Sequence, residues 1–201
     1  MKAVITGDII DSQKFGAEVW YKALQEIFEG KTSQEWENYR GDEFQYLIPN
    51  AEDAFLEFLK IKAGIKKIQD LDVRISIGLG DQNFVADKVS QSNGSAFVNS
   101  GRNLERIKAE KINLHIASEK PELDAQLNLI FKWVSLTVDS WSVMSAEIVD
   151  LFLNKKDINQ DEAAKLLNLT QSSISQRLKR ANYDLLMETE AYYRQLISQQ
   201  K

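Results

Sequence analysis

The sequence predicts an α/β (α+β) protein, in which an antiparallel sheet with packed helices is followed by an all-helical tail. Three observations support this class. Short runs of alternating apolar residues are interleaved with longer runs that repeat every three to four residues. Up to residue 80 these runs follow the order strand, helix, strand, strand, helix, strand. Beyond residue 140 only helical patterns remain.

The first half of this order starts at the N-terminus. Residues 2–7 are apolar and β-branched and end on Asp8, as expected for a buried strand with a carboxylate at its tip. A helix is predicted over 17–29. Residues 33–39 and 43–48 are strand-like, and the short link between them, which contains a glycine, predicts a hairpin.

The second half completes a recognisable unit. Asn50 can cap a helix whose apolar stripe continues to Gln69, and residues 73–80 alternate as a strand. The order βαββαβ describes the split βαβ, ferredoxin-like arrangement, in which the helices pack on one face of an antiparallel sheet. Three elements follow, namely a helix over 94–109, a strand over 111–117 and a helix over 122–138.

Composition excludes several kinds of site. Of the 201 residues 43% are apolar and 27% charged, with no Cys and one His. Disulfides, thiol nucleophiles, structural zinc and His clusters are therefore excluded, so any bound metal must have oxygen ligands. No run of about 18 apolar residues occurs, and the N-terminus turns acidic before a signal region forms. We expect a cytoplasmic protein that makes no membrane contact.

The charge changes sign along the chain. Residues 1–154 carry 17 basic and 24 acidic side chains, a balance of −7, whereas residues 155–201 carry 8 and 6, a balance of +2. A short apolar helix over 142–153 and a polar joint over 154–158 separate the two parts. We therefore predict two domains, 1–139 (the front domain) and 140–201 (the tail), with different partners.

The tail carries the clearest local pattern. Asn159 and Glu162 form a capping box, and Asn168 stands where a left-handed residue would end the helix. A second helix follows, with Ile174 and Leu178 as its buried residues. Two short helices joined by a short turn form a helix-turn-helix.

The second helix of this pair exposes groups that suit DNA. Polar side chains can contact base edges and cations can contact phosphates; the alternative is a helical pair that only packs or binds protein. So few cations bind DNA weakly, and we therefore expect a homodimer. The helix over 183–197, with Tyr192 and Tyr193, is its candidate surface, although this helix could instead pack on its own domain. The predicted DNA-binding residues are Gln171, Ser172, Ser173, Gln176, Arg177, Lys179 and Arg180.

Asp8 and Asp42 are the candidate metal ligands. In the predicted sheet the first strand is central and neighbours the hairpin, so the two carboxylates converge. Close carboxylates favour a cation between them, and Mg²⁺ prefers oxygen ligands. Asp11 and Glu43 lie near enough to assist. The alternative is that both aspartates only satisfy turn chemistry.

Four segments together resemble the bacterial SatD family. They are ITGDIIDS (Ile5–Ser12), RGDEFQYLI (Arg40–Ile48), VRISIGLGD (Val73–Asp81) and NGSAFVNSGRNLE (Asn93–Glu105). The similarity covers almost the whole chain, including the tail, and implies no particular reaction.

The same segments resemble, more distantly, class III nucleotide cyclases and GGDEF-type diguanylate cyclases. This resemblance implies a palm-type fold with Mg²⁺ on Asp8 and Asp42 and, if the site is active, an Arg and an Asn that steady the transition state. Arg102 matches the Arg, and Asn99 stands one residue after the Asn position. The implied nucleotide-binding residues are Ile9, Asp11, Ser12, Asn38 and Arg40. Asn38 replaces the Lys or Glu that reads the base, and Arg40 replaces a glycine.

Other residues are open to two readings. Arg102 and Arg106 share a helix face and either meet phosphates or pair with nearby glutamates. His115 is expected to be half-buried and satisfied. Three tryptophans in apolar stripes are expected to be buried, namely Trp20, Trp133 and Trp141.

Three functions remain open. The first is a DNA-binding transcriptional regulator whose front domain senses a nucleotide or a divalent metal. The second is a metal-dependent nucleotidyl cyclase or related phosphotransferase with a regulatory tail. The third is an adaptor that only binds partner proteins.

Overall fold

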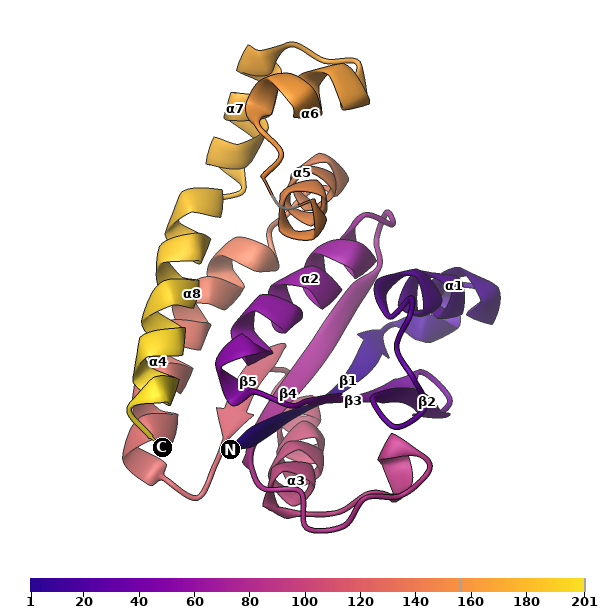
Figure 1. Ribbon diagram of the computed structural model, residues 1–201. Coiled ribbons are helices and arrows are strands. Elements are labelled where there is room, and N and C mark those ends of the chain that lie inside the picture. Colours follow the sequence, from indigo (N-terminus) through magenta and orange to yellow (C-terminus); the bar gives the residue numbers. More distant parts are fainter. Residues whose placement is uncertain (156, 201) are drawn as a thin grey trace.

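A computed structural model describes residues 1–155 and 157–200. These residues form a five-stranded mixed sheet and eight α-helices (Figure 1). The strands are β1 (Lys2–Ile10), β2 (Trp36–Arg40), β3 (Glu43–Ile48), β4 (Asp72–Gly80) and β5 (Leu114–Ala117). The helices are α1 (Ala17–Ile27), α2 (Ala54–Lys66), α3 (Ser95–Glu110), α4 (Pro121–Val138), α5 (Val143–Asn154), α6 (Gln160–Leu167), α7 (Gln171–Arg180) and α8 (Tyr183–Ser198). The joint expected over 154–158 contains Lys156, which lies outside the described residues.

The sheet has the strand order β2-β3-β1-β4-β5. The central strand β1 pairs in antiparallel fashion with β3 and β4, and β2 completes the hairpin with β3. These four strands therefore have the order expected for the split βαβ unit. The fifth strand, β5, joins β4 in parallel, which extends the sheet beyond that unit and makes it mixed.

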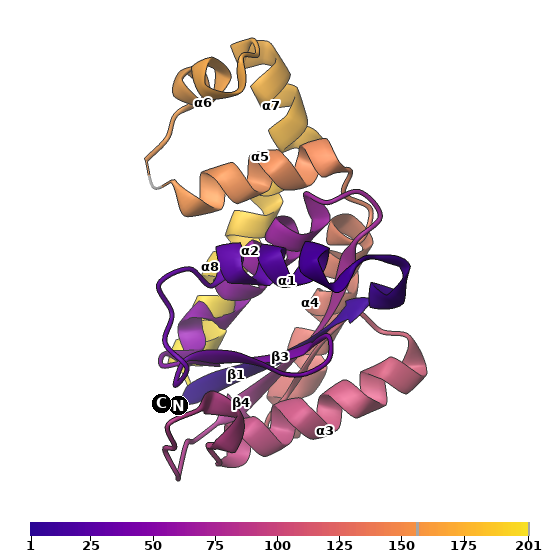
Figure 2. The ribbon, with the colours of Figure 1, turned by 90° about the vertical axis from the view of Figure 1, so that its right-hand side faces the viewer.

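Helices cover both faces of this sheet (Figure 2). The two helices of the predicted unit, α1 and α2, lie together on one face, but α3 lies on the other. The expectation that the helices of the βαββαβ unit occupy one face is therefore confirmed for α1 and α2, and α3, which follows that unit, covers the other face. Alternate residues of β1 divide accordingly, since Ile5 joins the main core and Val4 joins a smaller cluster under α3.

The layer under α3 also contains a buried polar network. The hydroxyls of Thr6 and Ser100 lie 2.6 Å apart, and Ser76 donates to the Ser100 carbonyl at 2.8 Å. Asn103 donates to Ser76 at 2.8 Å. These side chains are buried and mutually satisfied, so α3 is fixed on the sheet by specific hydrogen bonds as well as by packing.

Gly78 allows α3 to approach β4 closely. A Cβ atom at this position would lie 2.2 Å from the carbonyl oxygen of Ala96 and 2.3 Å from the backbone nitrogen of Ser100. Any side chain here would push the helix away from the strand. The glycine therefore serves the helix crossing.

The tail packs against the front domain. In Figure 1, α5 lies beside α2 and α8 runs back along α4. One apolar cluster includes residues from β1 through α8, so the core continues across the predicted boundary between residues 139 and 140. Trp141, at this junction, is buried and donates from Nε1 to the Ala181 carbonyl at 3.1 Å.

The helix expected as a dimer surface is partly buried within its own chain. Tyr193 of α8 is 1% exposed, and its ring packs against Phe55 and Phe131. Its hydroxyl donates to the Ala51 carbonyl at 3.0 Å. Tyr193 therefore packs within its own chain, but on residues of the front domain and not on its own predicted domain. The homodimer stays a prediction, and Tyr193 cannot belong to its surface, whereas Tyr192 is exposed.

The tryptophans divide two to one. Trp20 and Trp141 are buried as expected, but Trp133 is 69% exposed, so its predicted burial is wrong. Leu129 and Leu136 are exposed on the same helix, α4. Within the described part of the chain, no helix has both the length and the apolar character needed to cross a membrane.

Candidate functional site

The helix pair α6–α7 forms from the local signals expected. The Asn159 side chain accepts from the Glu162 backbone, and the Glu162 side chain accepts from the Asn159 backbone. Asn168 ends α6 with φ 52°, in the left-handed region. Ile174 and Leu178 bury the inner face of α7. The rest of α7 is thereby left to face outward.

The predicted DNA-binding residues separate into two groups. Ser173 is half-buried, and its hydroxyl lies 2.8 Å from the hydroxyl of Thr170, the residue that caps α7. Arg177 is half-buried and forms an ion pair with Glu147 of α5 at 3.0 Å. Both therefore serve the fold of the tail. The others lie on the exposed face, namely Gln171, Ser172, Gln176, Lys179 and Arg180.

Asp8 and Asp42 lie at adjacent strand ends. Asp8 is opposite Glu43 in the β1–β3 register, and the Asp42 carbonyl accepts from the Ile9 backbone at 3.3 Å. Burial is the main cause that raises the pKa of Asp8, and the negative charge of Asp42 acts in the same direction. The β-sheet thus brings the two residues together, as the topology predicted.

The carboxylates of Asp8 and Glu43, here called the acidic group, already have cationic partners within the chain. Arg74 of β4 donates from Nη1 to both carboxylate oxygens of Asp8, at 3.0 and 3.3 Å. Lys108 of α3 donates to Glu43 at 2.6 Å. Burial alone would raise the pKa of Glu43, but hydrogen bonds from Lys108 and Tyr39 outweigh it and hold that pKa below its usual value.

This arrangement does not fit Mg²⁺ as the residues lie. The ion would need the Asp8 oxygens that Arg74 occupies, and the positive charges of Arg74 and Lys108 would repel it. Direct ion pairing here replaces the metal that close carboxylates otherwise require. The metal site stays a prediction, and we derive no chemical step from it.

The hairpin residues predicted to bind nucleotide have local roles. Asn38 donates from Nδ2 to the carbonyls of Gly41 and Glu43, at 2.9 and 3.0 Å, so its amide closes the hairpin turn. Arg40 is exposed and forms no ion pair with a described residue. Arg40 is thus the hairpin cation left open to an external group.

The three predicted nucleotide contacts after Asp8 differ in burial: Ile9 is buried, Ser12 is half-buried and Asp11 is exposed. Ile9 is buried in the main core. Asp11 has a left-handed backbone, with φ 56°, and pairs with Lys14 at 2.5 Å. Ser12 begins a short 3-10 helix over Ser12–Lys14.

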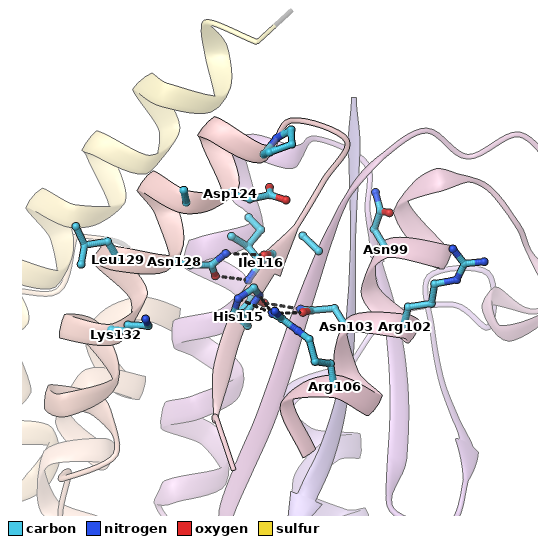
Figure 3. A pocket seen from close by; sticks show the side chains of 13 residues that line it. Asn99, Arg102, Asn103, Arg106, His115, Ile116, Asp124, Asn128, Leu129 and Lys132 are labelled. Atoms are coloured by element: carbon cyan, nitrogen blue, oxygen red, sulfur yellow. Dashed lines mark hydrogen bonds between the residues drawn. The ribbon is translucent and has the colours of Figure 1, made fainter. Parts of the chain in front are cut away.

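Arg102 and Asn99 line a different part of the surface. They belong to an open cleft of about 820 Å³ between α3, β5 and α4 (Figure 3). Lys108, by contrast, joins α3 to the Asp8 group. The two residues expected to assist catalysis therefore lie in a cleft that neither Asp8 nor Asp42 lines.

His115 occupies the centre of this cleft. Arg106 donates from Nη2 to the His115 ring, 2.6 Å from Nε2, and to Asn103 at 2.9 Å. Burial and the adjacent Arg106 charge lower the pKa of His115 to about 4. His115 is half-buried and satisfied, as expected.

Three cations were missed by the sequence reasoning. Arg74 and Lys108 neutralise the acidic group, and Lys132 of α4 lines the cleft beside α3. Arg74 had a signal, because a charged side chain in a mostly buried strand needs a partner. Lys132 had none, since its position depends on how α4 packs.

The family model of the SatD family matches residues 3–197, which include the sheet, the cleft and α7. Neither the curated proteins nor the solved structures gave a match to this chain.

Proposed function

The chain belongs to the SatD family, and we propose that it is a DNA-binding transcriptional regulator. In this proposal α7 contacts DNA, and the front domain binds the ligand that regulates it. The observation that supports it is the outward face of α7, where amide and hydroxyl groups stand at the N-terminal end and cations at the C-terminal end. This distribution suits base edges followed by phosphates.

Two cations of α7 are available to phosphates. Lys179 and Arg180 are exposed and form no ion pair with a described residue, whereas Arg177 is held by Glu147. The ion pair between Arg177 and Glu147 fixes α7 against α5 and would hold α7 in one orientation on DNA. We therefore assign phosphate contact to Lys179 and Arg180 and a positioning role to Arg177.

Two unpaired cations bind DNA weakly, and the chain has a net charge of −5. Two copies bound to adjacent half-sites would double the number of phosphate contacts. We therefore propose binding as a homodimer. Tyr193 is excluded from its interface by burial.

The nucleotidyl cyclase alternative has less support. It requires a metal on Asp8 together with Arg102 and Asn99 at the same substrate. Arg74 occupies the Asp8 oxygens, and the other two residues line the cleft. An adaptor role would leave unexplained why α7 exposes polar and cationic groups in place of apolar ones.

The direct test is fluorescence anisotropy with labelled duplex from the protein's own upstream region, at several salt concentrations. We expect binding at low salt. The double variant Lys179→Gln, Arg180→Gln should reduce the slope of log K against log salt by about 2 per chain. Gln176→Ala should instead change sequence preference and leave the slope unaltered.

The matched control is Lys22→Gln on α1, because Lys22 is exposed and far along the chain from α7. It should bind duplex as the wild type does. The proposal fails if no duplex binds at low salt. It also fails if the double variant, shown to be folded by circular dichroism, keeps the wild-type slope.

A further inference from the structure

The arginines of this chain differ in their partners. Arg74, Arg177 and Arg194 each form an ion pair with a carboxylate. Arg102 and Arg106 form none with any residue that the structure describes. Both line the cleft between α3 and α4. Cations without acidic partners in a concave site invite an external anion.

A third cation lies on the opposite wall. Lys132 of α4 lines the same cleft, is exposed, and forms no ion pair with a described residue. In Figure 3 the side chains of Arg106 and Lys132 come from separate helices on either side of His115. Three positive charges therefore border one cleft in a protein whose net charge is −5.

Among the described residues, no polar neighbour forms an ion pair with these cations. Asp124, the one acid among the residues lining the cleft, accepts from the backbone and hydroxyl of Ser118 at 2.9 and 2.6 Å. Asn128 exchanges two hydrogen bonds with the backbone of Ile116, both at 2.9 Å. This pair closes the free edge of β5. Both side chains are thus committed to the fold.

His115 holds Arg106 without cancelling its charge. The ring is neutral at neutral pH because its pKa is about 4. As a neutral acceptor it orients one guanidinium nitrogen of Arg106, and Asn103 accepts from that nitrogen as well. The positively charged group is therefore positioned in advance, which lowers the entropic cost of binding.

The remaining wall is apolar. The first turns of α4 present Pro121, Ala125 and Leu129 to the cleft. At about 820 Å³ the cleft has the size range of small-molecule sites, roughly 300 to 1,000 Å³. A ligand with an anionic end and an apolar or flat end would match both walls.

We propose that this cleft binds a phosphate-bearing small molecule of about nucleotide size. Arg102, Arg106 and Lys132 contact the phosphates, since guanidinium groups match phosphate oxygens in pairs. Pro121, Ala125 and Leu129 contact the rest of the ligand. This inference deepens the proposed function, because it assigns a ligand class and a place to the front domain of the regulator.

The test measures binding to the full chain in the absence of DNA. Thermal unfolding is followed at constant ionic strength with orthophosphate, pyrophosphate, each nucleoside mono-, di- and triphosphate, and each parent nucleoside. At least one phosphate compound should raise Tm, and its parent nucleoside should not. Calorimetry on the double variant Arg102→Gln, Lys132→Gln should then show affinity at least tenfold weaker.

The double variant should fold, because both side chains are exposed and neither forms an ion pair with a described residue. Lys22→Gln is again the control and should bind as the wild type. If pyrophosphate raises Tm as much as a nucleotide does, the result supports the contacts of the cations with phosphate but not the contacts of the apolar wall. The inference is overturned if no phosphate compound raises Tm, if the double variant binds equally well, or if sulfate at the same concentration acts identically.

The two proposals fail separately. If the protein binds DNA but no phosphate compound, the proposal that the cleft is a ligand site is rejected, and the proposal that α7 binds DNA stands. If the protein binds a phosphate compound but no DNA, the cleft stands as a ligand site, and the proposal that the protein is a DNA-binding regulator is rejected.

Discussion

Two regions in contact with α3, the end of β1 and the α3–α4 cleft, differ in whether their charged side chains form ion pairs. At the end of β1, Asp8 and Glu43 meet Arg74 and Lys108, so the charges are satisfied within the chain. In the α3–α4 cleft, cations from two helices form no ion pair with any carboxylate that the structure describes. A charge that is satisfied internally holds the fold, whereas one that is left open can serve binding. Substitutions should therefore cost stability in the first region and binding in the second.

The largest effect is expected for Arg74→Ala. It leaves Asp8, which is 8% exposed, without its cation, and removes the bond from Nε to the Ile112 carbonyl. Breaking a buried pair costs about 3 kcal/mol of unfolding free energy. Urea denaturation at pH 7 measures this loss.

The same variant should show a specific pH dependence. Without Arg74, burial raises the pKa of Asp8 further above its value of about 4 in the unfolded chain. The folded state then keeps a proton that the unfolded state releases, so the variant loses stability as pH rises above about 4. A loss that is equal at pH 4 and pH 7 would contradict this account.

A smaller loss is expected for Lys108→Ala. Lys108 supports Glu43 by a charged hydrogen bond, but its side chain is partly exposed and Tyr39 still donates to Glu43. We expect a loss of about 1.5 kcal/mol. Lys108→Arg should recover most of it. An unchanged urea midpoint in Lys108→Ala would show that this pair does not stabilise the fold.

Protonation of His115 is expected to lower the stability of the protein modestly at acid pH. Its folded pKa of about 4 lies below the unfolded value, so stability falls as pH decreases from 6.5 towards 4. Arg106 opposes protonation, while Asp124 and Glu110 favour it. With allowance for its half-exposed ring, the loss is about 1 kcal/mol.

The difference between wild type and His115→Asn isolates this effect from the carboxyl groups, which also titrate near pH 4. Because His115 is the single histidine of the chain, its ring protons can be titrated directly by NMR. A midpoint near 6.5 would contradict the burial and the Arg106 contact.

The smallest change in stability is expected for Arg102→Ala. Its side chain is exposed and has no partner among the described residues, so the loss should stay within about 0.5 kcal/mol. Urea denaturation next to Arg74→Ala makes the comparison direct, since both substitutions remove the same group. Equal losses would erase the distinction between the two regions.

Local patterns predicted much of the fold. The strand over 43–48 and the capping box at Asn159 were found where the residues indicated, because both depend on neighbours in sequence. The side of the sheet taken by α3 was not predictable in this way. It depends on Gly78 and on polar contacts that form only once the layers meet.

The face of α4 shows where periodicity fails. Leu127 and Phe131 are buried, while Leu129 and Trp133 are exposed on the same helix. Both sets are apolar at helical spacing, so the sequence contains two stripes and cannot indicate which one is covered. The predicted burial of Trp133 failed for this reason.

Strand order predicted only part of the candidate site. The adjacency of Asp8 and Asp42 follows from the central position of β1. The Arg74 contact depends on the register of β1 against β4, and a shift of one residue would point Arg74 to the other face. The Arg177 pair with Glu147 likewise depends on how α5 and α7 cross.

One consequence follows from the placement of α8. It begins after Ala181, which Trp141 fixes beside α7, and just beyond its end Gln200 accepts from Lys120, next to Pro121 at the cleft. With 16 residues this rod is about 24 Å long, so a tilt of about 10° at one end shifts the other by about 4 Å. A tilt of α8 about its cleft end would therefore displace the end next to α7 by a distance comparable to one helical turn.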